Sequence, residues 1–189
     1  KSLFYVAAIM FPSLAILIIL GGHLIQFIPK WQMKWEPATI SLIFFSLNAM
    51  VSSMSGILVN VLDATGKVKV TLRLMMIWTV LTWTLTPVLI KILGYNGVAI
   101  ASFLVTLTIV YTVVLVRRSV PFSFYKTIMK PAVATFIMSI LLLAMSQFFV
   151  ANLPLLIMAA AIGGIVYLGL FWLIARSELR EVKLFLRKS

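Results

Sequence analysis

The sequence contains no cysteine, a single histidine and only four acidic residues among its 189 positions. Without cysteine, the chain has no disulfide, thiolate metal site or thiol chemistry. General acid–base catalysis needs positioned titratable groups, and the scattered carboxylates and histidine offer no pair. Walker, G-x-S-x-G and H-E-x-x-H motifs are also missing. These absences predict a protein that is not an enzyme and that binds no metal, nucleotide or other cofactor.

Charge of either sign is scarce as well. Charged residues make up 11% of the chain and hydrophobic residues 63%, whereas soluble domains are about 25% charged and about 45–50% apolar. A membrane helix needs roughly 20 apolar residues, and membrane strands alternate apolar and polar positions, which these continuous runs do not. We therefore predict an all-α, polytopic transmembrane helical bundle. Its six predicted spans are 3–20, 38–61, 70–93, 97–116, 131–150 and 153–175.

The basic residues are distributed unevenly over the connections between these spans. When the connections are placed alternately on two sides of a membrane, thirteen of the sixteen lysines and arginines share the side of residues 62–69. The positive-inside rule then predicts a multi-pass protein of the cytoplasmic membrane, with both ends of this segment in the cytoplasm. Topology also accounts for the net charge of +12, so we expect no nucleic acid partner. The basic tail 176–189 is either an amphipathic interfacial helix or an ordinary cytoplasmic tail.

Ionisable side chains occur only near the ends of the spans, and the second span carries the most polar face. Asn48, Ser52, Gly56 and Asn60 recur at intervals of four residues, which places them on one side of a helix. In a membrane such a side packs against another helix or lines a wet cavity. Packing is favoured for Ser52 and Gly56, and a cavity is a competing explanation for Asn48 and Asn60. Threonines form a similar face on the third span. The candidates for a substrate path are Asn48, Ser52, Asn60, Asp63, Thr79 and Thr82.

Two further features concern the ends and bends of the helices. The stretch LDATGKVKV at 62–70 has a glycine that ends a helix, and Lys67, Lys69 and Arg73 then form a cytoplasmic basic loop. We expect its aspartate to cap the turn or to pair with one of these cations. Pro12 and Pro87 lie within predicted spans, where proline removes a helical hydrogen bond, so both are predicted hinges.

The order of these motifs resembles one known family. The second span ends in ILVNVLDATGKVKV, and PVLIKILGYNGVAIASFLV leads from the third span into the fourth. In the polysaccharide-type flippases of the MOP superfamily, which are related to MATE transporters, a helix ends in a pattern similar to L-x-A-x-G-K-x-K. The next helix has a proline near its outer end, and G-x-x-G-x-A-x-A opens the one after it. The matching positions are Leu62, Ala64, Gly66, Lys67 and Lys69, then Pro87, Gly94, Gly97, Ala99 and Ala101.

This resemblance implies that the chain is the C-terminal part of a longer, Wzx-like flippase. Residues 1–118 would be four helices of the second lobe, 119–175 two additional C-terminal helices, and 176–189 the basic tail. Flippases of this family move polyprenyl-pyrophosphate-linked oligosaccharide from the inner to the outer leaflet by alternating access, for cell-surface polysaccharide biosynthesis. The implied partners are therefore the lipid bilayer, this lipid-linked oligosaccharide, and the first lobe in the missing N-terminal part of the same polypeptide.

Three other functions are alternatives to a flippase, and each makes a demand on the sequence. A MATE-type drug or cation antiporter usually needs a carboxylate inside the membrane, and no span has one near its middle. A non-transporting scaffold subunit predicts a complete protein of six spans, without a polar stripe that faces a cavity. A membrane-embedded glycosyltransferase needs a set of acidic loop residues, which this chain lacks.

Overall fold

The computed structural model describes residues 2–27, 35–118, 120, 123–148 and 152–176. All regular structure in these ranges is helical, and six helical segments are long and apolar enough to cross a membrane. The predicted all-α, polytopic membrane bundle is therefore confirmed. Of the predicted tail 176–189, only Arg176 lies within the described ranges.

The helices follow the predicted spans with three differences. The first span continues to Phe27, the fifth begins at Phe124 and contains Pro131 inside the helix, and the fourth is interrupted. The helices are α1 (Ser2–Phe27), the 3₁₀ helix η1 (Glu36–Ala38), α3 (Thr39–Ala64), α4 (Val68–Leu93), α5 (Asn96–Thr106), α6 (Ile109–Arg117), α7 (Phe124–Phe148) and α8 (Leu153–Ile174).

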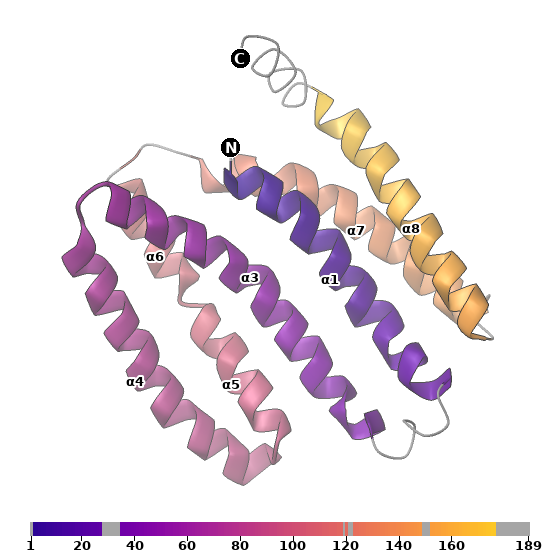
Figure 1. Cartoon of the computed structure of the whole chain (residues 1–189), viewed down its shortest axis with the longest axis horizontal. Helices are drawn as coiled ribbons and strands as arrows, with labels where there is room; N and C mark the ends of the chain where they lie inside the picture. Colours follow the sequence, from indigo (N-terminus) through magenta and orange to yellow (C-terminus); the bar gives the residue numbers. More distant parts are fainter. Residues whose placement is uncertain (1, 28–34, 119, 121–122, 149–151, 177–189) are drawn as a thin grey trace.

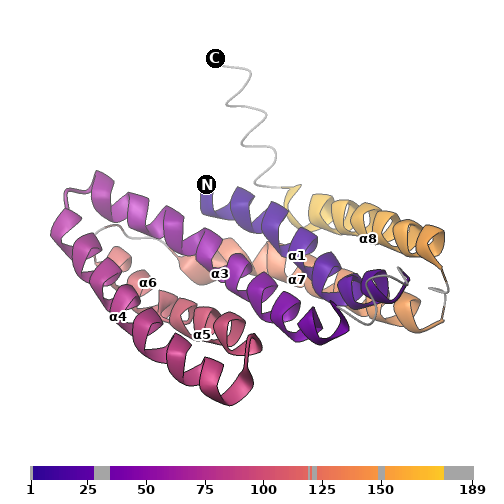
Figure 2. The same cartoon turned by 60° about the horizontal axis from the view of Figure 1, so that its bottom comes forward.

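The helices are arranged as two halves around a central pair. Helices α1 and α3 lie side by side at the centre of the bundle (Figure 1). On one flank, α5 packs against both α3 and α4, and on the other flank α7 packs against both α1 and α8. Figure 2 shows the same arrangement from a second direction, with α4 and α8 at opposite edges. We call α3 to α6 the first half, and α1, α7 and α8 the second half.

Helix α1 contributes to the hydrophobic cores of both halves. Leu3, Ala7 and Phe11 pack in a buried cluster with side chains of α3, α4 and α6. Further along the helix, Ala15 and Leu20 pack in a second cluster with side chains of α7 and α8. Helix α1 thus passes from one core to the other near its Pro12, and the first turns of α7 also pack against the first core through Phe124 and Ile128.

One end of the bundle gathers most of the described basic residues. Because consecutive long helices alternate in direction, the start of α1, the α3–α4 turn, the end of α6, the start of α7 and the end of α8 all lie at this end (Figure 1). We call it the basic end. Its exposed cations are Lys67, Lys69, Arg73, Arg117, Arg118 and Arg176.

The turn between α3 and α4 is built around Gly66. This residue has a φ of +75°, which favours glycine. The amide of Lys67 donates to the carbonyl of Leu62 at 2.9 Å, and the amide of Gly66 donates to the carbonyl of Asp63 at 3.0 Å. This pair of bonds is the Schellman arrangement that ends many helices. Asp63 thus contributes its backbone, and in the described part of the chain no ion pair joins its carboxylate to Lys67 or Arg73.

The start of α5 approaches the backbone of α4 very closely at Gly97. A Cβ atom at this position would lie 2.3 Å from both the carbonyl carbon and the carbonyl oxygen of Leu89. Any side chain at residue 97 would therefore push the fourth span away from the third. This contact gives a steric reason for a glycine at one of the positions that carry the family resemblance.

The predicted hinge at Pro12 is held by a side chain of α8. Proline has no amide hydrogen, so the carbonyl of Ala8 has no helical partner. The hydroxyl of Tyr167 donates to this carbonyl at 2.7 Å in a buried position. Tyr167 also stacks on Phe171, whose ring contacts that of Phe4 in α1. Helix α8 therefore restrains α1 at the point where α1 changes cores.

Replacement of Tyr167 tests this restraint. Tyr167→Phe keeps the aromatic ring but leaves the Ala8 carbonyl buried and unpaired, so we expect the free energy of unfolding to fall by about 0.6–1.7 kcal/mol. Amide hydrogen exchange in α1 near Pro12 should also rise. The control is Tyr111→Phe, because Tyr111 is exposed. Equal exchange in both variants would show that the hydrogen bond does not restrain α1.

Candidate functional site

The fourth span is interrupted between α5 and α6, close to its middle. The amide of Leu107 is shared between the carbonyls of Phe103 and Leu104, at 3.2 Å each, and the amide of Thr108 donates to Val105 at 3.1 Å. Proline and glycine, which usually break helices, are absent from this stretch. The Thr108 hydroxyl donates to the Val105 carbonyl at 2.7 Å. It thereby competes with the backbone ladder, as short polar side chains often do.

Side chains from two neighbouring helices hold this interruption in place. Trp78 of α4 donates from its indole Nε1 to the hydroxyl of Thr108 at 2.8 Å. The hydroxyl of Thr106 lies within hydrogen-bonding distance of the Asn48 side chain of α3 and is 2.9 Å from the Ser102 carbonyl. The interrupted stretch is therefore fixed from both sides by polar contacts inside the membrane-spanning part of the bundle.

A hollow of about 150 Å³ lies beside the interruption. Side chains of α3, α4 and α5 line it, namely Ser52, Ser55, Trp78, Val105 and Thr106. Ser55 is buried and Ser52 is exposed, so the hollow connects the interior with the surface of α3. Its polar groups are neutral hydroxyls and an indole. The Ser52 and Thr106 hydroxyls and the Trp78 indole already donate within the bundle, so the lining offers hydroxyl oxygens as acceptors and supplies no titratable group.

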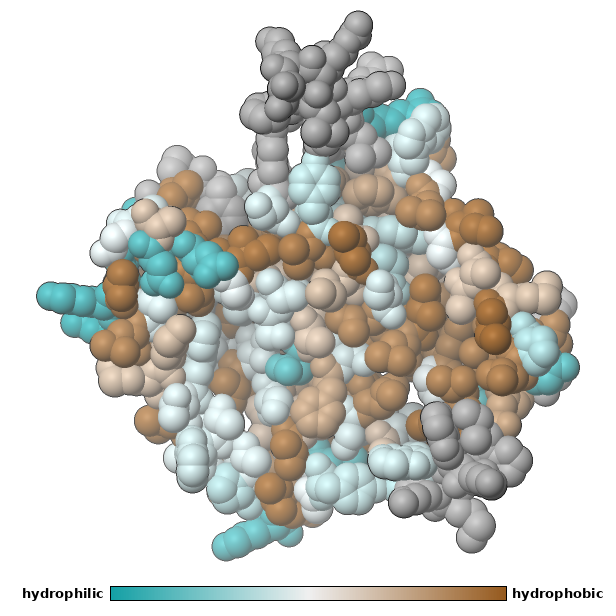
Figure 3. Space-filling model, viewed as in Figure 1, coloured by the Kyte–Doolittle hydropathy of each residue, from teal (hydrophilic) through white to brown (hydrophobic). Residues whose placement is uncertain are grey.

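A polar stripe continues from this hollow along the surface of α3 to the basic end. We call Ser52, Gly56, Asn60 and Asp63 the polar stripe, because all four are exposed and recur at helical spacing on one side of α3. A Cβ atom at Gly56 would meet no atom within 4 Å. Figure 3 shows hydrophilic and weakly polar side chains mixed with apolar ones on the face that carries α3.

The residues that the sequence predicts as one substrate path lie in different environments in the structure. Packing is expected for Ser52 and Gly56, and both are exposed among the described residues, whereas Asn48 is partly buried and bonded to α5. Thr79 and Thr82 are exposed on α4 and do not line the hollow. Lys67, Lys69 and Arg73 are exposed at the basic end, and Pro87 lies inside α4.

Three residues of the site escape the sequence analysis, namely Trp78, Thr106 and Thr108. The two threonines flank Leu107 in a span that otherwise consists mostly of apolar residues. This pair of hydroxyls was the feature of the sequence that could have indicated a break in the helix. Nothing in the sequence indicates that Trp78 reaches them, because it belongs to a different helix, 30 residues away from Thr108. The interruption is thus a tertiary feature.

Comparison of the chain with family models, with curated proteins and with solved structures finds no match. The likeness to the flippase family is therefore a resemblance, carried by the quoted residues of the second, third and fourth spans. The structure establishes a helical bundle with six candidate membrane spans.

The Trp78 contact can be tested with a matched pair of tryptophans. Trp78→Phe keeps an aromatic ring but removes the donor to Thr108, so we expect faster amide exchange at the start of α6. The control is Trp83→Phe, because Trp83 is 77% exposed in the same helix. Hydrogen exchange read by mass spectrometry compares the two. If both variants leave α6 as protected as the unchanged chain, the indole does not hold the interruption.

Proposed function

We propose that this chain is part of a transporter that moves polyprenyl-pyrophosphate-linked oligosaccharide across the cytoplasmic membrane by alternating access. The observation that carries the proposal is the polar stripe, which runs from the hollow at the interrupted span to the basic end. A transporter needs such a surface because the sugar and the pyrophosphate must cross the apolar layer beside polar groups.

A polar stripe of this kind is poorly suited to contact with lipid. Each buried polar group without a partner in hydrocarbon costs several kcal/mol. The amide of Asn60 is exposed on the surface of this chain, and the exposed Ser52 hydroxyl has a long bond of 3.4 Å to the Ala49 carbonyl. Gly56 between them presents bare backbone to its surroundings. The stripe therefore faces water or another part of the protein, and a first lobe that faces α3 would enclose a path between the two.

The basic end is suited to the loading side of this path. In the proposed orientation it lies in the cytoplasm, as the positive-inside rule predicts. Lys67, Lys69 and Arg73 are exposed there next to the last residue of the stripe, Asp63. Exposed cations at the mouth of a cleft raise the local concentration of anionic ligands, and a pyrophosphate is such a ligand.

Two features of the bundle suit a protein that changes between two states. Transporter sites often lie at interrupted helices near the middle of the membrane, and the break between α5 and α6 has this position. In addition, α1 changes cores at Pro12, which gives the two halves a common joint. Neutral oxygens in the hollow favour a flippase over an antiporter that couples transport to a buried carboxylate.

A leaflet-exposure assay with the complete protein tests the polar stripe. Ser52→Leu with Asn60→Leu should lower the rate of transport at least about tenfold, which corresponds to about 1.4 kcal/mol in the barrier. The reason is that the apolar side chains remove hydrogen-bonding groups from the path. The control is Thr84→Leu, because Thr84 is an exposed hydroxyl on α4. Equal transport by both variants at equal protein levels would contradict the proposal.

The same assay tests the cations of the loading side. Lys67→Ala with Lys69→Ala should slow transport, and the effect should weaken as salt is added, because salt screens exposed charges. Lys91→Ala is the control, since Lys91 is exposed at the last turn of α4, away from the basic end. Unchanged transport after loss of both lysines would restrict their role to topology.

A further inference from the structure

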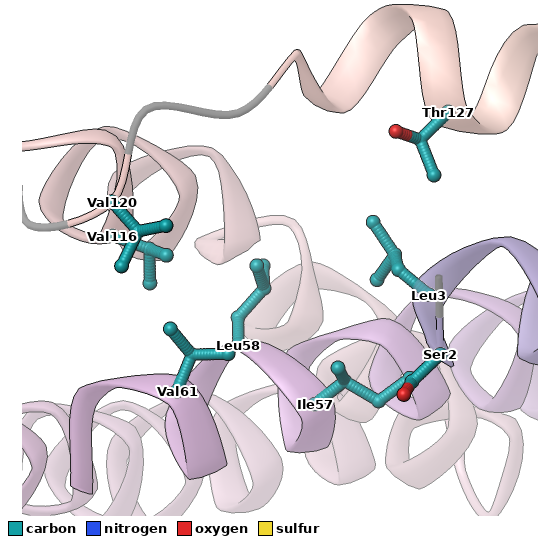
Figure 4. Close-up of a pocket in the computed structure, with 8 residues that line it drawn as sticks. All are labelled: Ser2, Leu3, Ile57, Leu58, Val61, Val116, Val120 and Thr127. Atoms are coloured by element: carbon teal, nitrogen blue, oxygen red, sulfur yellow. The ribbon is translucent and has the colours of Figure 1, made fainter. Parts of the chain in front are cut away.

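A second, apolar hollow lies at the basic end, where the two halves of the bundle meet. Its volume is about 240 Å³. Side chains from α1, α3, α6 and α7 point toward this common space (Figure 4). Its lining includes Leu3, Ile57, Val61, Val116, Val120 and Thr127. We call this space the wedge.

The wedge follows from how the halves are joined. Helix α6 packs on α3 in the first half, and α7 packs on α1 in the second half. Helices α1 and α3 lie in contact between the halves. The last turn of α6 and the first turn of α7 therefore leave a space between them at the basic end. Val116 closes the wedge from one half, and Leu3 and Thr127 close it from the other (Figure 4).

The lining selects an aliphatic ligand. Most of the lining residues are valine, leucine or isoleucine, and the polar ones carry only hydroxyl groups. The hydroxyl of Thr127 already donates to the Ser123 carbonyl at 2.9 Å. The volume of the wedge is roughly eight times the volume that one water molecule occupies in liquid water. This is room for part of one narrow, unbranched chain, and an apolar chain gains free energy there by leaving water or a poorly packed site.

Two exposed arginines adjoin the wedge along the chain. Arg117 and Arg118 stand in the chain between two lining residues, Val116 and Val120, and both arginines are exposed. In the described part of the basic end, Asp63 is the one acidic residue. Basic pockets between membrane helices bind the head groups of anionic lipids. An aliphatic chain that enters the wedge therefore has an anionic head group as its best complement.

We propose that the wedge binds one acyl chain of an anionic phospholipid, whose phosphate lies against Arg117 and Arg118. The bound chain fills the space between the halves and so stabilises one of their relative positions. This site is separate from the polar stripe, because it is lined by other residues and takes an apolar ligand. The inference does not depend on transport, and its test measures binding alone.

The test titrates the delipidated full chain in detergent with dioleoylphosphatidylglycerol or with dioleoylphosphatidylcholine, and native mass spectrometry counts the bound lipids. We expect one phosphatidylglycerol to bind more tightly than phosphatidylcholine. Val61→Phe fills the wedge and should abolish this difference, whereas Val80→Phe, at a 61% exposed position of α4, should preserve it. Should Val61→Phe fail to fold, Val120→Phe fills the same space from outside the helices.

The head-group contact has its own pair of variants. Because one arginine near a membrane surface contributes about 1 kcal/mol, Arg117→Gln and Arg118→Gln should each weaken phosphatidylglycerol binding about fivefold. Lys91→Gln at the other end is the control and should leave binding unchanged. Equal affinity for the two lipids, or equal binding by the Val61→Phe and Val80→Phe variants, would overturn the proposal. A polyprenyl phosphate that displaces phosphatidylglycerol from the wedge would also overturn it, because the wedge would then be a substrate site.

Discussion

The hydroxyl of Tyr167 donates to the Ala8 carbonyl at the point where α1 leaves one hydrophobic core and enters the other. The bond exists because Pro12 removes the amide that this carbonyl would otherwise accept from. In an apolar medium an unpaired carbonyl is costly, so α8 is drawn to this turn of α1. This contact fixes α8 on α1 within the second half, at the turn where α1 passes from one hydrophobic core to the other.

The same constraint, that polar groups inside a membrane must find partners, explains the centre of the first half. Thr106 and Thr108 use their hydroxyls locally, and the break that results is held by Asn48 and Trp78 from the neighbouring helices. In the described part of the chain no neighbouring helix bonds to the exposed side chains of the polar stripe on α3, and the Ser52 hydroxyl bonds back to the Ala49 carbonyl of its own helix. The contrast between satisfied and exposed polar groups on one helix is the physical basis of the proposed path.

Much of the fold could be predicted because the apolar runs are long and Gly66 ends a helix by a known local mechanism. The boundaries were less predictable. The first predicted span, 3–20, stops seven residues short of Phe27, and the fifth, 131–150, starts seven residues after Phe124, yet both of these additional segments are helical. The interruption of the fourth span is held by side chains of other helices, and the exposure of Gly56 depends on where the neighbouring helices lie, so neither could be derived from spacing along one helix.

The central claim is that the polar stripe faces water in the membrane. The chain has no native cysteine, so single cysteines at Gly56 and Asn60 can be compared with cysteines at Phe136 and Ile165, which are exposed apolar positions of α7 and α8. The measurement is the rate of labelling by a water-soluble maleimide in membranes that contain the complete protein. We predict fast labelling at Gly56 and Asn60 and slow labelling at Phe136 and Ile165, because the thiolate that reacts forms only in contact with water. Equally slow labelling at all four positions would contradict a water-lined path along α3.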